Sequence, residues 1–132
     1  MIILGLGSNL GNRQANLDLA INAVSSQLLN NIVCSSVIAT RPLLPPNPQA
    51  GWEKQDFLNM AIGGTLKNIL TPEEFLQKIK AIEASIGRTP APVWAPRAID
   101  IDILVWDNLV YSSPTLTIPH KELFKRDFAL KP

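Results

Sequence analysis

Apolar residues recur along the chain with two different periods, and these periods predict which segments form strands and which form helices. The nearly continuous apolar run from Ile2 to Leu6 is typical of a buried strand. The next segment changes to the helical period, with apolar residues three or four positions apart, and this predicts a helix over residues 14–28 with one buried face. The residues that carry this spacing are Leu17, Ile21, Val24 and Leu28.

A second helix is predicted over residues 72–86 by signals at both of its ends. Thr71 is a preferred N-cap, Pro72 suits the first helical position, and Glu74 lies where it can complete a capping box with Thr71. Gly87 is a typical residue at which a helix stops. The apolar stripe of this helix consists of Phe75, Ile79, Ile82 and Ile86.

Further strands are predicted where β-branched or alternating residues recur. They cover residues 31–41, 57–66, 99–104, 109–111 and 116–118, with a turn at Asn108. Two proline-rich segments, residues 42–56 and 88–97, are expected to be long functional loops. The order β-α-β-β-α-β predicts an α+β fold, a ferredoxin-like split βαβ sandwich in which an antiparallel sheet carries two helices on one face.

Length and composition fit one packed domain. The chain has 132 residues, 46% hydrophobic and 17% charged, so we expect a single domain over residues 1–132. A net charge of +1 gives no long-range attraction to nucleic acids or membrane surfaces. The apolar run at the N-terminus is too short for a signal peptide or a membrane span, which predicts a cytoplasmic protein. Cys34 is the single cysteine, and its apolar-rich segment predicts a buried, unreactive thiol.

Asp100 and Asp102 form the clearest candidate site. Side chains alternate between the two faces of a strand, so these carboxylates share one face while Ile99, Ile101 and Ile103 share the other. Two adjacent carboxylates repel each other unless a cation lies between them, and hard oxygen ligands suit Mg²⁺ or Mn²⁺. The strand alone is equally consistent with a solvated edge strand whose charges discourage aggregation.

Other polar candidates are ambiguous when each is considered singly. Arg88 and Arg97 bracket the second proline-rich segment and suit a polyphosphate, because guanidinium groups match phosphate oxygens, but ordinary solvated arginines fit as well. His120 is the only histidine, and a structural role is the commoner one for such a residue. Lys80 and Glu83 lie three positions apart on the second helix, where a surface ion pair is the simplest interpretation.

The glycine-rich segment after the first strand does not form a known nucleotide loop. Its spacing of Gly5, Gly7 and Gly11 is one residue too long for a dinucleotide fingerprint, and the acidic residue expected further on is missing. A phosphate loop of the G-x-x-x-x-G-K-[ST] type is also absent from the sequence. Phe57 and Phe128, taken singly, fit core positions.

Four groups of residues, taken together, resemble one family. They are Gly7-Ser8-Asn9-Leu10-Gly11, Phe57-Leu58-Asn59, Pro96-Arg97-Ala98-Ile99-Asp100-Ile101-Asp102-Ile103, and Ile118-Pro119-His120 with Arg126 and Phe128. In order and spacing they resemble the 6-hydroxymethyl-7,8-dihydropterin pyrophosphokinases over nearly the whole chain. The resemblance implies transfer of pyrophosphate from ATP to the hydroxymethyl group of the dihydropterin in folate biosynthesis, with AMP and the pterin diphosphate as products.

The resemblance also implies a role for each matching residue. Catalysis is implied for Arg88, Arg97, Asp100 and Asp102, and the two aspartates would hold two Mg²⁺ ions. ATP binding is implied for Lys80, Glu83, Arg88, Arg97, Ile103, Thr117, His120 and Arg126, with Lys80 standing where the family commonly has Gln. Pterin binding is implied for Thr40, Pro42, Leu43, Phe57, Asn59, Trp94, Asp100 and Phe128, with the rings of Phe57 and Phe128 on either side of the pterin.

The partners that the resemblance implies are ATP and the dihydropterin alcohol, with neither nucleic acid nor membrane. Such enzymes usually continue past the Leu-x-Pro that ends this chain and are often fused to dihydropteroate synthase. We therefore expect either a truncated C-terminus or one module of a bifunctional enzyme, and a monomer as an isolated domain.

Two other functions stay open from the residues alone. A Mg²⁺-dependent phosphohydrolase could use the same two aspartates and would need no pterin pocket. A ferredoxin-like ligand-binding module without catalysis is the third hypothesis, although binding alone would not require both aspartates and both arginines.

Overall fold

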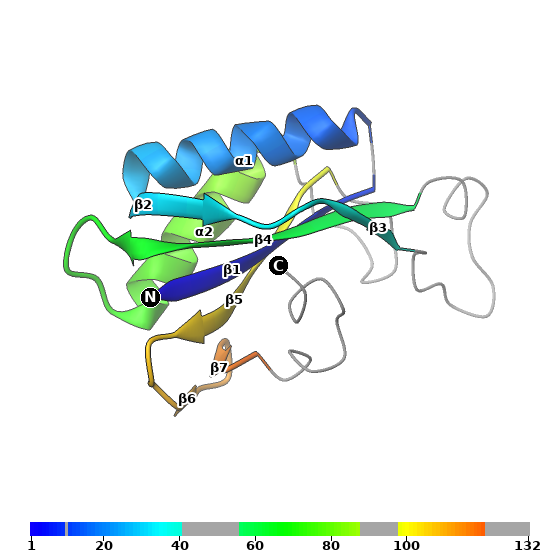
Figure 1. The fold of residues 1–132 in the computed structure, drawn as a ribbon. Helices are drawn as coiled ribbons and strands as arrows, with labels where there is room; N and C mark the ends of the chain where they lie inside the picture. Colours follow the sequence, from blue (N-terminus) through cyan, green and yellow to red (C-terminus); the bar gives the residue numbers. More distant parts are fainter. Residues whose placement is uncertain (10, 41–55, 88–97, 121–132) are drawn as a thin grey trace, which may run out of the picture.

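The computed structural model describes residues 1–9, 11–40, 56–87 and 98–120, and Figure 1 shows how their helices and strands are arranged. In chain order the elements are β1 (Ile2–Ser8), α1 (Arg13–Gln27), β2 (Leu29–Cys34), β3 (Ile38–Thr40), β4 (Phe57–Leu66), α2 (Pro72–Ile86), β5 (Asp100–Trp106), β6 (Tyr111–Ser112) and β7 (Thr117–Ile118). This order confirms the predicted α+β class and the alternation of strands and helices.

The main sheet is antiparallel, with strand order β2-β4-β1-β5 and β3 as a further partner of β4. In each βαβ unit the two strands joined by a helix are therefore not neighbours, because a strand of the other unit lies between them. This is the split arrangement predicted from the sequence. It leaves β5 at one edge of the sheet, where a second sheet of β6 and β7 follows it along the chain.

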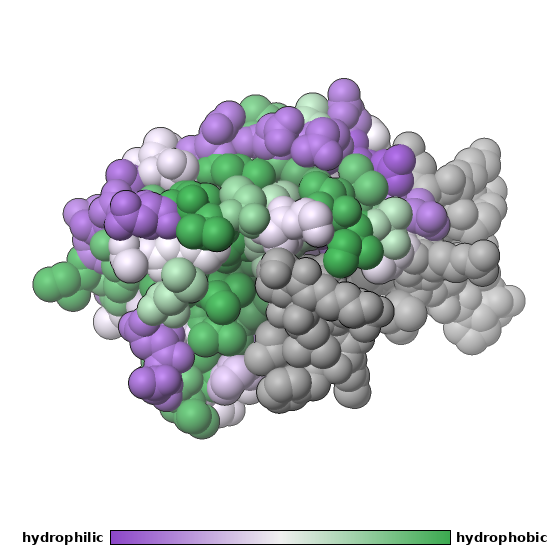
Figure 2. Space-filling view, in the orientation of Figure 1, coloured by the Kyte–Doolittle hydropathy of each residue, from purple (hydrophilic) through white to green (hydrophobic). Residues whose placement is uncertain are grey.

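Both helices pack on the same face of the sheet. One core cluster joins Leu17 and Val24 of α1 and Phe75 and Ile79 of α2 to alternate residues of β1, such as Leu4. These five side chains are 0% exposed. The exposed side of α1 is polar apart from Leu19, and Figure 2 shows hydrophilic groups gathered along this helix at the top of the molecule. Neither helix in the described part of the chain is long and apolar enough to cross a membrane.

The ends of α2 have the structure that the sequence predicts. Thr71 Oγ1 accepts a hydrogen bond from the backbone N–H of Glu74 (3.2 Å), and Glu74 Oε1 accepts one from the N–H of Thr71 (2.9 Å). Gly87 ends the helix in the left-handed region, with φ of 117°. The hydrogen bonds from the backbone and side chain of Thr71 lower the pKa of the Glu74 carboxyl. Desolvation opposes them with a smaller effect, and the positive charge of Lys78 makes the smallest contribution, which also lowers the pKa.

Two predictions about the region after α1 are wrong. The extended segment predicted over residues 31–41 is two strands, β2 and β3, because the pairing with β4 is interrupted after Cys34. Cys34 was predicted to be buried, but its side chain is exposed. The reason is that β2 is the outer strand of the sheet, and only its first residue, Leu29, is fully buried in the core.

Candidate active site

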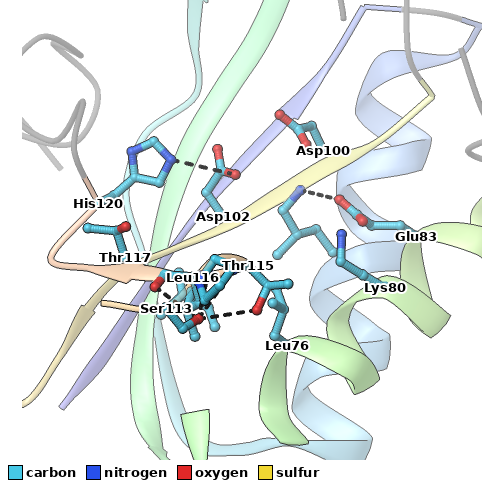
Figure 3. A pocket seen from close by; sticks show the side chains of 13 residues that line it. Leu76, Lys80, Glu83, Asp100, Asp102, Ser113, Thr115, Leu116, Thr117 and His120 are labelled. Atoms are coloured by element: carbon cyan, nitrogen blue, oxygen red, sulfur yellow. Dashed lines mark hydrogen bonds and ion pairs between the residues drawn. The ribbon is translucent and has the colours of Figure 1, made fainter. Parts of the chain in front are cut away.

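The carboxylates of Asp100 and Asp102 lie on the face of the sheet opposite the helices. Ile101 and Ile103 are buried in the helix-side core, at 4% and 2% exposure, whereas both aspartates are partly exposed. Figure 3 shows the two carboxylates pointing to the same side of β5. The predicted division of this strand into an apolar and an acidic face is therefore confirmed.

The neighbouring strand β1 presents glycines to these aspartates. Gly7 lies opposite Asp100 and Gly5 lies opposite Asp102 in the antiparallel register of β1 with β5. Gly7 also lies opposite Asn59 of β4. Directly opposite residues share a face, so Asp100, Gly7 and Asn59 form one row across three strands, with no side chain at its centre.

A side chain at Gly7 would crowd its neighbours. A Cβ at this position would lie 3.0 Å from Asn59 Oδ1 and 3.4 Å from Cδ1 of Phe57. Asn59 is 7% exposed, and its amide donates a hydrogen bond to the hydroxyl of Thr40 on β3. Three residues predicted for the pterin site, Thr40, Phe57 and Asn59, are thus brought together on β3 and β4.

The Gly7–Gly11 motif makes the connection from β1 to α1. Ser8 is fully buried, and its hydroxyl accepts a hydrogen bond from the amide of Asn16 (3.3 Å) on the helix. Gly11 has a φ of 71°, a backbone conformation that favours glycine. Asn12 then caps α1 by accepting a bond from the N–H of Ala15 (3.1 Å). The described part of this motif therefore has a structural explanation.

A cavity of about 330 Å³ lies along the outer edge of β5 (Figure 3). Its walls come from α2, from β5 and from the segment that ends in β7. The lining residues are Leu76, Lys80, Glu83, Asp100, Ile101, Asp102, Ile103, Ser113, Pro114, Thr115, Leu116, Thr117 and His120. The structure thus brings together seven predicted site residues, namely Lys80, Glu83, Asp100, Asp102, Ile103, Thr117 and His120.

Glu83 joins α2 to the edge of β5. The residue is 5% exposed, and its Oε2 accepts a hydrogen bond from the backbone N–H of Ile101 (2.8 Å). An edge strand presents N–H groups that the sheet leaves unpaired, so a buried carboxylate is a strong acceptor for one of them. The interpretation of Glu83 as one half of a surface ion pair is therefore wrong, because the packing of α2 against β5 buries its side chain.

His120 is held beside Asp102 through its backbone. The pairing of β1 with β5 is irregular at one point. Ile103 pairs with Leu4 and Val105 pairs with Ile3, so Leu104 is an extra residue in β5. The Leu104 carbonyl accepts a hydrogen bond from the N–H of His120 (2.9 Å). The imidazole Nε2 then lies 3.8 Å from Asp102 Oδ1.

Sequence reasoning missed one wall of the cavity. Ser113, Pro114, Thr115 and Leu116 form the loop between β6 and β7, and Leu76 adds an apolar contact from α2. A signal for Leu76 was present, because Leu76, Lys80 and Glu83 follow helical spacing and therefore share one face of α2. The loop could not be placed in this way, since its position depends on contacts distant in the sequence.

The donor set at Asp100 and Asp102 fits a magnesium ion that also binds phosphate. Among the residues that the structure describes, no group of three or more His, Cys, Asp or Glu side chains is close enough to hold a metal ion. Mg²⁺ is commonly held by one or two carboxylates and completes its shell with water and substrate phosphates. Two partly exposed carboxylates beside an open cavity suit that kind of site.

Seven predicted site residues lie outside the described residues. They are Pro42, Leu43, Arg88, Trp94, Arg97, Arg126 and Phe128. Their roles stay predictions.

Comparison with known proteins identifies the family. The family model for 7,8-dihydro-6-hydroxymethylpterin-pyrophosphokinase matches residues 3–132. A 2-amino-4-hydroxy-6-hydroxymethyldihydropteridine pyrophosphokinase of Aquifex aeolicus is 37% identical over 132 residues, which cover 99% of this chain and 76% of that protein.

Two bifunctional proteins are similarly related. A folate synthesis bifunctional protein of Chlamydia muridarum is 37% identical over 131 residues, 98% of this chain and 28% of that protein. The bifunctional protein FolKE of Lactococcus lactis subsp. lactis is 37% identical over 129 residues, 98% of this chain and 35% of that protein. The chain therefore spans about a third or less of these bifunctional relatives. The match to the family model over nearly its whole length shows that the chain belongs to the 7,8-dihydro-6-hydroxymethylpterin-pyrophosphokinase family.

Proposed function

We propose that this chain transfers the pyrophosphoryl group of ATP to the hydroxymethyl oxygen of 6-hydroxymethyl-7,8-dihydropterin and releases AMP, as a step of folate biosynthesis. Family membership and the name of the Aquifex relative support this reaction. The observation that carries the proposal for this chain is the row of Asp100, Gly7 and Asn59, which connects the candidate nucleotide cavity to a polar site on β4.

The two co-substrates are proposed to bind on either side of the aspartates. ATP would occupy the cavity between α2, β5 and the loop 113–116, with Lys80, Glu83, Ile103, Thr117 and His120 around it. The pterin would lie over β1 and β4, where glycines leave room for a flat ring. Asp100 and Asp102 lie between these two regions, so the phosphates and the hydroxymethyl group would meet beside them.

The pterin pocket combines a hydrogen-bonding edge with aromatic faces. The Asn59 amide is oriented by Thr40 and is proposed to bind the polar edge of the pterin. Phe57, with Phe128, is proposed to stack on the ring, because aromatic faces hold flat ligands well. Pro42, Leu43 and Trp94 are proposed to complete this pocket.

The proposed step is an in-line displacement at the β-phosphorus. The hydroxymethyl oxygen forms a bond to that phosphorus and releases its proton to water. The bond from the β-phosphorus to the oxygen that bridges the α- and β-phosphates breaks, and AMP leaves with that oxygen. Transfers of this kind pass through a loose transition state, so the protein contributes alignment and charge neutralisation more than covalent chemistry.

The chain's own residues would supply that alignment and charge. Asp100 and Asp102 are proposed to hold two Mg²⁺ ions, which when bound neutralise phosphate charge. Arg88 and Arg97 are proposed to bind the same phosphates and to add positive charge where it develops. His120, held by its backbone beside Asp102, is proposed to contribute a further donor on the nucleotide side.

Product analysis tests the proposal. The protein is incubated with ATP, Mg²⁺ and 6-hydroxymethyl-7,8-dihydropterin, and the products are separated by chromatography, with controls that lack pterin or contain excess EDTA. AMP formed one-for-one with the pterin diphosphate, and only with pterin and Mg²⁺, supports the proposal. ADP and phosphate formed without pterin would identify a phosphohydrolase instead. Binding of both substrates without turnover would identify a non-catalytic module and overturn the proposal.

The wider setting is part of the same proposal. Because relatives include bifunctional folate synthesis proteins, we propose that this domain works in fusion or association with another folate enzyme, dihydropteroate synthase being the expected one. Its polar small-molecule substrates are consistent with action in the cytoplasm.

A further inference from the structure

One carboxylate outside the proposed reaction holds a wall of the nucleotide cavity. Glu73, in the first turn of α2, accepts hydrogen bonds from Thr115 Oγ1 at 2.6 Å (to Oε1) and 2.9 Å (to Oε2). Ser113 Oγ lies 3.3 Å from each of the same two oxygens. Both hydroxyls belong to the loop 113–116. This loop connects β6 to β7 and lines the cavity.

This loop needs support from outside. Its flanking strands, Tyr111–Ser112 and Thr117–Ile118, have two residues each, and a two-stranded hairpin is at best marginally stable by itself. Internal bonds set the shape of the loop: Ser113 N–H donates to the Leu116 carbonyl (2.8 Å), and Ser113 Oγ accepts from Leu116 N–H (3.1 Å). They do not set its distance from α2. Leu116 holds one side of the loop in the core cluster, and the bonds to Glu73 hold the hydroxyls of Ser113 and Thr115 against α2.

Glu73 begins the stripe of α2 that faces the cavity. Glu73, Leu76, Lys80 and Glu83 follow one another at helical spacings of three and four, so they share one face. At the far end of this stripe, about 15 Å along the helix axis, Glu83 bonds to the backbone of β5. Two carboxylates of one helix thus hold two different walls, and Leu76 and Lys80 between them line the cavity.

We infer that Glu73 is a positioning residue for the nucleotide co-substrate, because it fixes the loop 113–116 at the distance from α2 that the nucleoside of a ribonucleoside triphosphate requires. This inference rests on the proposed function for its assignment of the cavity to ATP. Of the described residues predicted for the pterin site, Thr40, Phe57 and Asn59 do not line this cavity. Asp100 does line it, but it is held in place by the pairing of β5 with β1 and not by the loop 113–116. Loss of Glu73 therefore acts on the nucleotide and not on the pterin.

The test compares Glu73→Ala with Glu74→Ala. The two residues are adjacent acids in the first turn of α2, but Glu74 bonds to Thr71 in the capping box and does not line the cavity. Steady-state kinetics are measured for both substrates, together with equilibrium binding of a non-hydrolysable ATP analogue. For Glu73→Ala we expect KM for ATP and Kd for the analogue to rise about tenfold, with KM for pterin and kcat within about twofold of wild type. Glu74→Ala is expected to lower the melting temperature without changing nucleotide affinity.

A double-mutant cycle adds a readout that a general loss of stability would not move. Thr115→Val removes the principal hydroxyl that bonds to Glu73. If the two residues act as one unit, the double variant binds the analogue no more weakly than Glu73→Ala alone. Should Glu73→Ala fail to fold, Glu73→Met replaces it in the cycle, because Met keeps the length and helix propensity of the side chain but has no oxygen that could accept the bond from Thr115.

Failure of the inference and failure of the proposed function give different results. Equal effects of Glu73→Ala and Glu74→Ala on nucleotide affinity, or additive effects of Glu73→Ala and Thr115→Val, would overturn the inference even in an active enzyme. A wild-type protein without pyrophosphoryl transfer would overturn the function. Weaker analogue binding in Glu73→Ala alone would then still support the role of Glu73 in holding the cavity wall.

Discussion

The imidazole Nε2 of His120 lies 3.8 Å from Oδ1 of Asp102, and the backbone N–H of His120 is bonded separately to the carbonyl of Leu104. The backbone of His120 therefore fixes where this residue lies, while its imidazole interacts with Asp102. Leu104 is the extra residue of β5, at the point where its pairing with β1 is irregular. The same residue supplies the carbonyl that accepts the hydrogen bond from His120.

This separation makes His120→Ala an informative variant. The bond from its backbone N–H to Leu104 is retained, so we expect the fold to be kept and the melting temperature to change little. Loss of the imidazole removes a hydrogen-bond donor from the nucleotide cavity, and we expect KM for ATP to rise about tenfold, the effect of losing one good hydrogen bond to a charged group. Steady-state kinetics with each substrate varied in turn provide the measurement. An unchanged KM for ATP would remove His120 from the nucleotide site.

Gly7→Ala tests the proposed pterin side independently of the nucleotide. The added methyl group would lie 3.0 Å from Asn59 Oδ1, so this group must move by a few tenths of an ångström, and it would be in contact with the Phe57 ring at 3.4 Å. We expect KM for pterin to rise about tenfold with KM for ATP unchanged.

Gly63→Ala is the matched control for this variant. Gly63 lies on β4, and a Cβ there would meet the flexible Met1 side chain at 3.0 Å, which can move away. Its expected KM for pterin is that of wild type. If Gly7→Ala left pterin binding unchanged, the pterin would have to bind elsewhere than over this row.

The capping box of α2 predicts an acid-dependent part of stability. Because hydrogen bonds from Thr71 lower the pKa of Glu74 in the folded protein, this carboxyl contributes stability that is fully present above its ordinary pKa of 4.5. That contribution is lost as the pH falls through the lowered value. Urea unfolding of wild type and Glu74→Gln at a series of pH values measures it. The difference between the two proteins should shrink on acidification below about pH 4.5, and a difference that grows would contradict the assignment.

How much could be predicted from the sequence depends on whether a signal was local. The limits of α2 were predictable because Thr71, Glu74 and Gly87 lie within or next to the helix they delimit. The shared face of Asp100 and Asp102 followed from the period of a strand. The split βαβ order followed from the order of such local signals along the chain.

Contacts between distant segments could not be predicted in this way. The row of Asp100, Gly7 and Asn59 depends on the register of three strands, and the burial of Glu83 depends on how α2 lies against β5. The predicted burial of Cys34 was wrong for the same reason, because the apolar character of a segment does not reveal that its strand lies at the edge of a sheet.

The most direct test of the central claim is the rate of pyrophosphoryl transfer in Asp102→Asn, measured as AMP and pterin diphosphate formed together. Asp18→Asn is the matched control, since Asp18 lies on the exposed face of α1 and, in the part of the chain that the structure describes, accepts a hydrogen bond from Gln14 of the same helix. Our account predicts that Asp102→Asn loses transfer by about a thousandfold and stays folded, because a like charge beside Asp100 has been removed, while Asp18→Asn retains full activity. Near-normal transfer by a folded Asp102→Asn would contradict the assignment of the aspartate pair as the catalytic centre.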